Sequence, residues 1–206
     1  MSINASHIMS KLKPGDVVNF NGNPHWYQFW LWFTYAQIRN YQRRDHPNSS
    51  RTDDIHTTLY LGDNRFLSTQ SPRTVIWPSL QIDKRTKSVR ICRYLSEIHV
   101  FNANDIKFMN RVAEDVVGTP YDYGQLADIL VKQLGAGFIP QEARIFDFGK
   151  TQRVCSVMAH WVLVKWWREV NKKVLPRPLG LSWVENTSPA DFCNHPTFRV
   201  IHEWRR

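Results

Sequence analysis

The sequence predicts an α+β fold in which a mostly antiparallel sheet packs against one buried helix. Short segments rich in β-branched and aromatic residues recur between residues 15 and 94, and turn-forming residues separate them. A long apolar segment with helical spacing begins at Cys155. The chain has 206 residues, and a chain of this size buries roughly 70% of its unfolded surface. We therefore expect residues 1–206 to form a single domain.

The expected strands lie in the first half of the chain, at residues 15–20, 55–61, 65–70, 74–77 and 88–94. The second and third strands flank the turn Gly62-Asp63-Asn64, which is typical of a β-hairpin. His56 stands at the edge of the first hairpin strand. Its direction is therefore fixed by the hairpin.

Helices are expected after the strands. One runs from about 104 to 117 behind an Asn102 or Asn104 cap, and a second covers roughly 122–134. Residues 135–152 contain three glycines and a proline, which predict a loop beside Cys155.

The segment 25–44 is the least ordinary part of the chain. Its aromatic and aliphatic residues fall at helical spacing and precede a basic end: Trp26, Phe29, Trp30, Phe33 and Ile38. Such a stripe packs on a sheet more often than it meets a membrane interface. We expect packing, with part of the surface shaping a substrate groove.

Cys155 lies in the first turn of the apolar helix. The unsatisfied backbone N–H groups and the positive end of the helix dipole favour a thiolate there, and Arg153 adds a positive charge. A lone helical cysteine is most often inert core, so Cys155 alone does not indicate a function. His160 lies on nearly the opposite helix face at roughly 100° per residue, which excludes it as a base for Cys155.

Five motifs follow one another along the chain. They are LKPGDVVNF at 12–20, IHTTLYLGDNRFL at 55–67, GTPYDYGQL at 118–126, RVCSVMAHWVL at 153–163 and SPADFCNHPTFRVI at 188–201. In this order they resemble the circularly permuted branch of the NlpC-type, papain-like cysteine hydrolases. The resemblance spans almost the whole chain and implies a papain-like α+β fold.

The resemblance implies that Cys155 is the nucleophile and His56 the base. A thiolate attacks a carbonyl, the imidazole protonates the departing amine, and water hydrolyses the thioester. The backbone N–H of Cys155 is the expected oxyanion donor, and Tyr121 or Tyr123 is a candidate for a second donor. Packing is at least as ordinary a role for either tyrosine. No cofactor and no metal are expected.

The third catalytic position departs from the family pattern, in which a carboxylate often follows the histidine strand. This chain has Ser68 there, and Gln70 lies on the same face of that strand. Either side chain can accept a hydrogen bond from the imidazole, but neither stabilises an imidazolium as a carboxylate does. Asp53 and Asp54 are further candidates for that charge, although a solvated turn is the more ordinary role for such a pair.

Charge and cysteine usage limit the class of protein. There are 27 basic and 18 acidic residues, a formal net charge of +9, which favours an anionic polymer surface as partner. No nucleic-acid motif accompanies it, and a solvated basic face is the more ordinary interpretation. The three cysteines cannot all pair, and their spacing matches no zinc pattern. Cys92 and Cys193 are expected to be packing residues.

The sequence predicts neither a secretory signal nor a transmembrane segment. With the family resemblance, the leading interpretation is a hydrolase that cleaves an amide bond in peptidoglycan peptide. Such a protein, made in the cytoplasm, requires delivery to the cell wall by phage lysis or contact-dependent secretion. One alternative is an acyltransferase, thioesterase or lipid hydrolase of the lecithin-retinol-acyltransferase-like branch. The other is a non-catalytic wall-binding or virion component.

Overall fold

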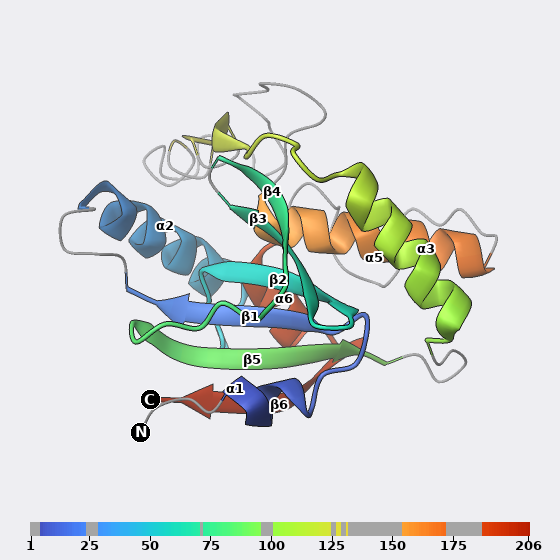
Figure 1. Ribbon diagram of the computed structural model, residues 1–206. Coiled ribbons are helices and arrows are strands. Elements are labelled where there is room, and N and C mark those ends of the chain that lie inside the picture. Colours follow the sequence, from blue (N-terminus) through green and yellow to red (C-terminus); the bar gives the residue numbers. More distant parts are fainter. Residues whose placement is uncertain are drawn as a thin grey trace.

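A six-stranded sheet with helices on both faces forms the protein, as the computed structural model in Figure 1 shows. The structure describes residues 5–23, 29–70, 72–95, 101–124, 127, 128, 131, 154–171 and 187–206. The strands are β1 (Val17–Gly22), β2 (His56–Gly62), β3 (Arg65–Gln70), β4 (Arg73–Trp77), β5 (Thr86–Tyr94) and β6 (Phe198–Arg205). The helices are α1 (Ala5–Met9), α2 (Phe29–Asp45), α3 (Ala103–Asp115), α5 (Cys155–Asn171) and α6 (Pro189–Asn194).

Neighbouring strands run antiparallel throughout this sheet, in the order β4-β3-β2-β1-β5-β6. The predicted α+β class and the mostly antiparallel sheet are therefore confirmed. The five predicted strands are all present, and β6 adds a sixth strand that begins within the motif 188–201 and ends at Arg205. Because β1 lies in the middle of the sheet, the first and last parts of the chain meet across β5.

Two turns fix the strands that carry the candidate site. Asp63 and Asn64, between β2 and β3, have φ values of 48° and 58°, and such a pair suits the twist of a tight hairpin. Gly15, before β1, has a φ of 88°, and a Cβ there would lie 2.5 Å from a ring carbon of Phe101. Only glycine fits this close approach without a shift of the ring.

The two faces of the sheet bury separate apolar clusters, because successive residues of a strand point to opposite sides. Leu59 and Leu61 pack with residues of α3, α5 and α6, and Tyr60 packs on the other face with residues that include Ile8 of α1. Figure 1 shows α5 and α6 behind the sheet and α1 in front of it. Helix α5 contacts β2 and β3, and the backbone of Thr57, near the beginning of β2, forms a hydrogen bond to its first residue, Cys155.

The outcome for the remaining predicted segments differs from one to the next. Asn102 caps α3 and its side chain accepts from the N–H groups of Asn104 and Asp105. Within the expected helix 122–134, residues 123, 124, 127, 128 and 131 are described and helical, whereas the expected loop 135–152 and Trp26 lie outside the described residues. No described helix has the length and apolar character needed to cross a membrane.

The aromatic segment is described in part, because the side chains of Phe29 and Trp30 lie outside the described residues. On α2, Trp32 is 43% exposed and Phe33 is 50% exposed. Gln42, three turns further along, is fully buried and donates to the carbonyl of Asp54 at 2.6 Å. The inward face of α2 is therefore partly polar, and the helix is held against the segment that leads into β2.

Candidate active site

Cys155 is the first residue of α5 and its side chain is almost fully buried. The backbone N–H groups of Thr57, Ser156 and Cys155 itself favour the thiolate, as expected at a helix N-terminus. Burial acts more strongly in the opposite direction and raises the pKa of Cys155 to about 11. The expectation of a stabilised thiolate is therefore wrong for this state: the thiol is protonated at neutral pH.

His56 is the first residue of β2, directly before Thr57. Its Nε2 atom lies 2.9 Å from the Oγ atom of Ser68 on β3. Thr58 is the residue paired with Ser68 across the two strands, so the histidine reaches its partner diagonally. Burial lowers the pKa of His56 to about 4, and the imidazole is neutral at neutral pH.

The backbone of Thr57 connects these two candidate residues. Its N–H group acts on the sulfur of Cys155, and its neighbour in the chain is His56. Among the described residues, the thiol and the imidazole do not share a hydrogen bond. When Nε2 carries the hydrogen and donates it to Ser68, Nδ1 is left with a lone pair that can accept a proton. The arrangement is a neutral acid and a neutral base on adjacent elements.

Ser68 and Gln70 were equal candidates for the third position, and the structure places them differently. Ser68 contacts the imidazole, whereas Gln70 is exposed and lines a cavity beside it. This cavity, of about 100 Å³, has a wall of aromatic, aliphatic and uncharged polar residues: Phe20, His56, Thr58, Phe66, Ser68, Gln70, Trp77, Ser79, Leu80 and Gln81. None of them carries a charge at neutral pH. An uncharged group is favoured there, because a charged group would lose hydration without gaining a partner.

Two tyrosines lie within the electrostatic environment of Cys155. Burial raises the pKa of Tyr121 well above its usual value, and a thiolate at Cys155 would raise it further. Tyr35 of α2 behaves in the same way, so both phenols stay protonated as potential donors. Tyr123 is 48% exposed, and its ring lies 5.2 Å from that of Tyr121. Sequence reasoning missed Tyr35, whose only signal was membership of the aromatic segment.

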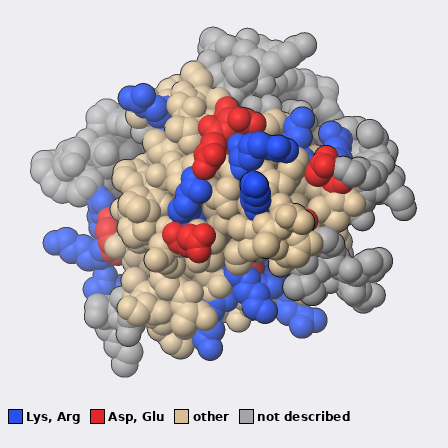
Figure 2. Space-filling view, turned by 45° about the vertical axis from the view of Figure 1, so that its right-hand side comes forward, with Lys and Arg blue, Asp and Glu red and all other residues tan. Residues whose placement is uncertain are grey.

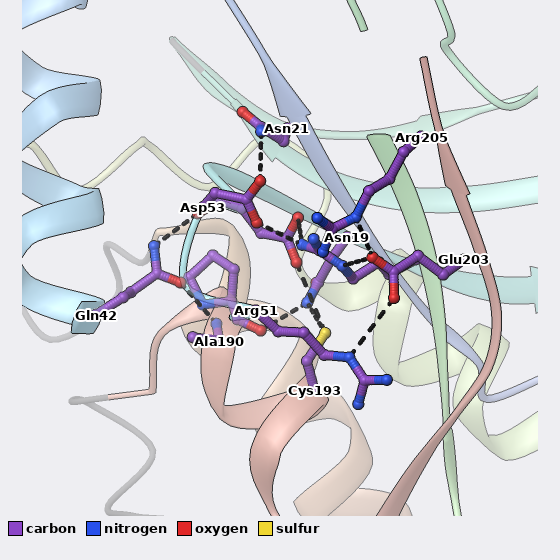
Figure 3. A network of polar contacts seen from close by, with 12 residues as sticks. Asn19, Asn21, Gln42, Arg51, Asp53, Ala190, Cys193, Glu203 and Arg205 are labelled. Carbon is purple, nitrogen blue, oxygen red and sulfur yellow. Dashed lines mark hydrogen bonds and ion pairs between the residues drawn. The ribbon is translucent and has the colours of Figure 1, made fainter. Parts of the chain in front are cut away.

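Asp53 and Asp54 do not contact His56 in the described contacts; both bind Arg90. Asp53 also accepts a hydrogen bond from the side chain of Asn21 (Figure 3). The Arg90 Nη1 atom lies 2.8 Å from Asp53 and 2.5 Å from Asp54, and Nε lies 3.0 Å from Glu203. Burial raises the pKa of Asp54 to about 6 despite the arginine. A solvated turn is therefore the wrong interpretation for Asp54, which is fully buried.

His160 is buried on α5, and its Nδ1 atom contacts the hydroxyl of Thr187. Burial lowers the pKa of His160 to about 4. The preceding turn of α5 is also attached to this segment, since Ser156 donates to the carbonyl of Thr187 at 2.6 Å. His160 therefore belongs to the packing of α5, as its helix face predicted.

Metal-ligating groups and surface charges can be followed among the described residues. Within the part of the chain that the structure describes, no three His, Cys, Asp or Glu side chains form a group that could hold a metal ion. Figure 2 shows acidic and basic side chains next to each other in the middle of one face. Some basic side chains are paired with carboxylates, including Arg85 with Asp83 and Arg93 with Asp16.

No protein-family model matches the chain, and no curated protein matches it.

Proposed function

We propose that the protein is a cysteine hydrolase that cleaves an amide bond, with Cys155 as nucleophile and His56 as base. The observation that carries the proposal is the hydrogen bond between the thiol of Cys155 and the backbone of Thr57, the residue that follows His56 in β2. The thiol lies at the start of α5, and the imidazole of His56 lies 2.9 Å from the hydroxyl oxygen of Ser68. The motif resemblance to permuted NlpC-type enzymes, with its papain-like fold, points to the same two residues.

The charge states define how such a site would work. The thiol and the imidazole are both neutral, so the reaction does not start from a pre-formed thiolate–imidazolium pair. Instead, His56 takes the proton from the thiol while the sulfur attacks the carbonyl. Ser68 keeps the ring in position by accepting from Nε2, so that Nδ1 can accept the proton. The imidazolium then gives its proton to the departing amine, and water hydrolyses the thioester in a second cycle.

The developing oxyanion needs donors close to the nucleophile. The backbone N–H groups of Cys155 and Ser156 lie at the free N-terminus of α5, where no helical carbonyl accepts them. The hydroxyl groups of Tyr121 and Tyr35 are protonated candidates for a further donor. Removing one donor of this kind from an enzyme costs roughly 10²–10³ in kcat.

Peptidoglycan peptide is the leading substrate, from the family resemblance and the net positive charge of the chain. A second candidate, acyl chemistry on a lipid or thioester, is favoured by the cavity beside His56. Its lining is apolar or uncharged, and the exposed Trp32 and Phe33 on α2 suit an apolar surface. A non-catalytic wall-binding or virion component is the third candidate, favoured by the absence of a carboxylate at position 68.

The test is mass spectrometry of soluble fragments released from purified sacculi by the wild type, Cys155→Ala and His160→Ala. The proposal expects fragments with the wild type and His160→Ala and none with Cys155→Ala, and the new ends of the fragments identify the bond. Equal release by Cys155→Ala would refute the proposed nucleophile. If sacculi yield nothing, Cys155-dependent turnover of a medium-chain acyl thioester would support the second candidate. Failure of both substrates would favour the non-catalytic role.

A further inference from the structure

Two cysteines outside the candidate active site lie in contact with each other. The sulfur atoms of Cys92 and Cys193 are 3.0 Å apart, and both residues are free. A disulfide bond is about 2.05 Å long, so the two sulfurs need to approach by only about 1 Å to bond. The two sulfur atoms, which are the atoms that a disulfide bond joins, are therefore already in contact.

The pair joins parts of the chain that are distant in sequence. Cys92 is fully buried on β5, and Cys193 is 5% exposed on α6, 101 residues later. Helix α6 and β6 complete one side of the core, where Phe192 and Phe198 pack against each other. A covalent bond here would fasten the last part of the described chain to an inner strand of the sheet.

Polar groups surround the sulfur of Cys193 and make its environment unlike an inert apolar site. The side-chain amide of Asn19 donates to this sulfur at 3.2 Å, and Asp54 accepts from the thiol at 3.6 Å. Asp54 in turn accepts a hydrogen bond from Arg90. A hydrogen-bond donor stabilises a thiolate during exchange, and a carboxylate is a place to which the proton can move.

We propose that Cys92 and Cys193 form a disulfide that ties α6 to the sheet and leaves Cys155 as the single free thiol of the chain. The proposed oxidant is a small disulfide of the glutathione type. Cys193 attacks one of its sulfurs and releases one small thiol, and Cys92 then attacks the mixed disulfide and releases the second. The two cysteine protons leave with the two small thiols, so that two thiols are oxidised and one small disulfide is reduced.

Such a bond would let the molecule keep its candidate nucleophile under oxidising conditions. Cys155 has its own surroundings at the start of α5, with the Thr57 backbone and Tyr121. Once Cys92 is bonded to Cys193, neither of these cysteines is available to form a disulfide with Cys155. The closed loop is about 100 residues long, for which chain entropy predicts a substantial rise in melting temperature, on the order of 5–15 °C.

The experiment uses the full chain, equilibrated with reduced and oxidised glutathione at a range of ratios. One sample is treated folded and another is refolded from denaturant in the same buffers, so that burial does not limit access. After acid quenching, free thiols are alkylated under denaturing conditions and counted by intact mass, and the bond is located by peptide mapping. Cys155→Ala is the matched control, and a double variant with Cys92→Ala and Cys193→Ala is the negative control.

The proposal expects one alkylated cysteine in the oxidised wild type, none in oxidised Cys155→Ala, and a peptide that joins Cys92 to Cys193. The oxidised wild type should melt above the reduced form, whereas the double variant should melt at one temperature in either buffer. Three alkylated cysteines in both samples at every glutathione ratio would overturn it. So would a bond that involves Cys155, or a lower melting temperature on oxidation.

Discussion

Two polar clusters lie on either side of the short segment 53–57, and they differ in charge. On one side, Asp53 and Asp54 bind the buried guanidinium of Arg90. On the other, His56 shares one hydrogen bond with Ser68 and has no charged partner in the described contacts. The first cluster contains charged side chains around a buried arginine, whereas the second contains only uncharged side chains.

The difference in charge suits the two clusters to different roles: the first stabilises the fold and the second is the candidate site of reaction. Burial alone would lower the pKa of Arg90, but Asp54 and Asp53 raise it, so the arginine stays charged. That ionic cluster fixes the backbone that enters β2 without presenting a charge to the imidazole. His56 is thereby positioned by its neighbours and kept neutral by burial, which is the state that a base for a buried thiol requires.

The largest expected difference between the two clusters is in turnover. His56→Ala should lower kcat/KM by about 10²–10⁴-fold, because it removes the proton acceptor of the nucleophile. His160→Ala removes a fully buried histidine of α5 and should change kcat/KM by less than about tenfold. The measurement is steady-state kinetics on whichever substrate the sacculus or thioester assay identifies. An equal loss of kcat/KM in the two variants would show that His56 has no special role in turnover.

The ionic cluster should dominate folding stability. Arg90→Met leaves two carboxylates near each other without their cation, and the free energy of unfolding should fall by about 3–5 kcal/mol. Arg65→Met, which breaks the exposed pair with Glu114, should cost less than about 1 kcal/mol. Urea denaturation of both variants measures the contrast. A similar cost for the two arginines would contradict the distinction drawn between buried and exposed pairs.

The pH dependence of stability should carry signatures of both clusters. The pKa values of His56 and His160 are lowered to about 4, so their contribution is complete above pH 6.5 and is lost as pH falls toward 4. Asp54 acts in the opposite direction, because its pKa in the folded protein is raised to about 6. As pH falls from about 6 toward 3.8, Asp54 is protonated in the folded protein before it is protonated in the unfolded chain, and the free energy of unfolding rises.

Each histidine should account for up to about 3 kcal/mol of that loss. His160→Asn should therefore flatten the decline of the free energy of unfolding between pH 6.5 and 4. The check is urea denaturation at intervals across that range. A decline as steep as that of the wild type would show that His160 does not titrate as its burial implies.

The smallest expected effect comes from giving His56 the carboxylate that the family pattern includes. Ser68→Asp should raise the pKa of His56 and move the acid limb of the pH–rate profile upward from about 4. Ser79→Asp is the matched control, since it places a charge in the same cavity without contacting the imidazole in the described structure. An NMR titration of the histidine ring reads the shift directly. An unchanged His56 pKa in Ser68→Asp would mean that position 68 does not control the base.

Local patterns in the sequence account for much of the fold. The hairpin follows from Gly62-Asp63-Asn64, and Asp63 and Asn64 do take positive φ angles. The α3 cap and the start of α5 at Cys155 are likewise where the sequence placed them. These features depend on a few adjacent residues, and for that reason they can be read without knowledge of the tertiary structure.

The chemistry of the site depends on contacts between residues that are distant in the chain, and local sequence patterns do not reveal these contacts. Ser68 and Gln70 share a strand face, and only the register and side-chain reach bring Ser68 to the imidazole. Asp54 meets Arg90 across 36 positions in the chain, so its burial had no local signal. The pKa of Cys155 was expected to fall at the helix N-terminus, but burial by distant elements outweighs those N–H groups.

The central claim is that Cys155 forms a covalent intermediate with the aid of His56. The most direct test is rapid mixing with substrate, quenching in acid, and peptide mapping for an acyl group on each cysteine. The account predicts a thioester on Cys155 that forms more slowly in His56→Ala and at the wild-type rate in His160→Ala. Turnover without any acyl group on Cys155, or equal acylation rates in the wild type and His56→Ala, would contradict it.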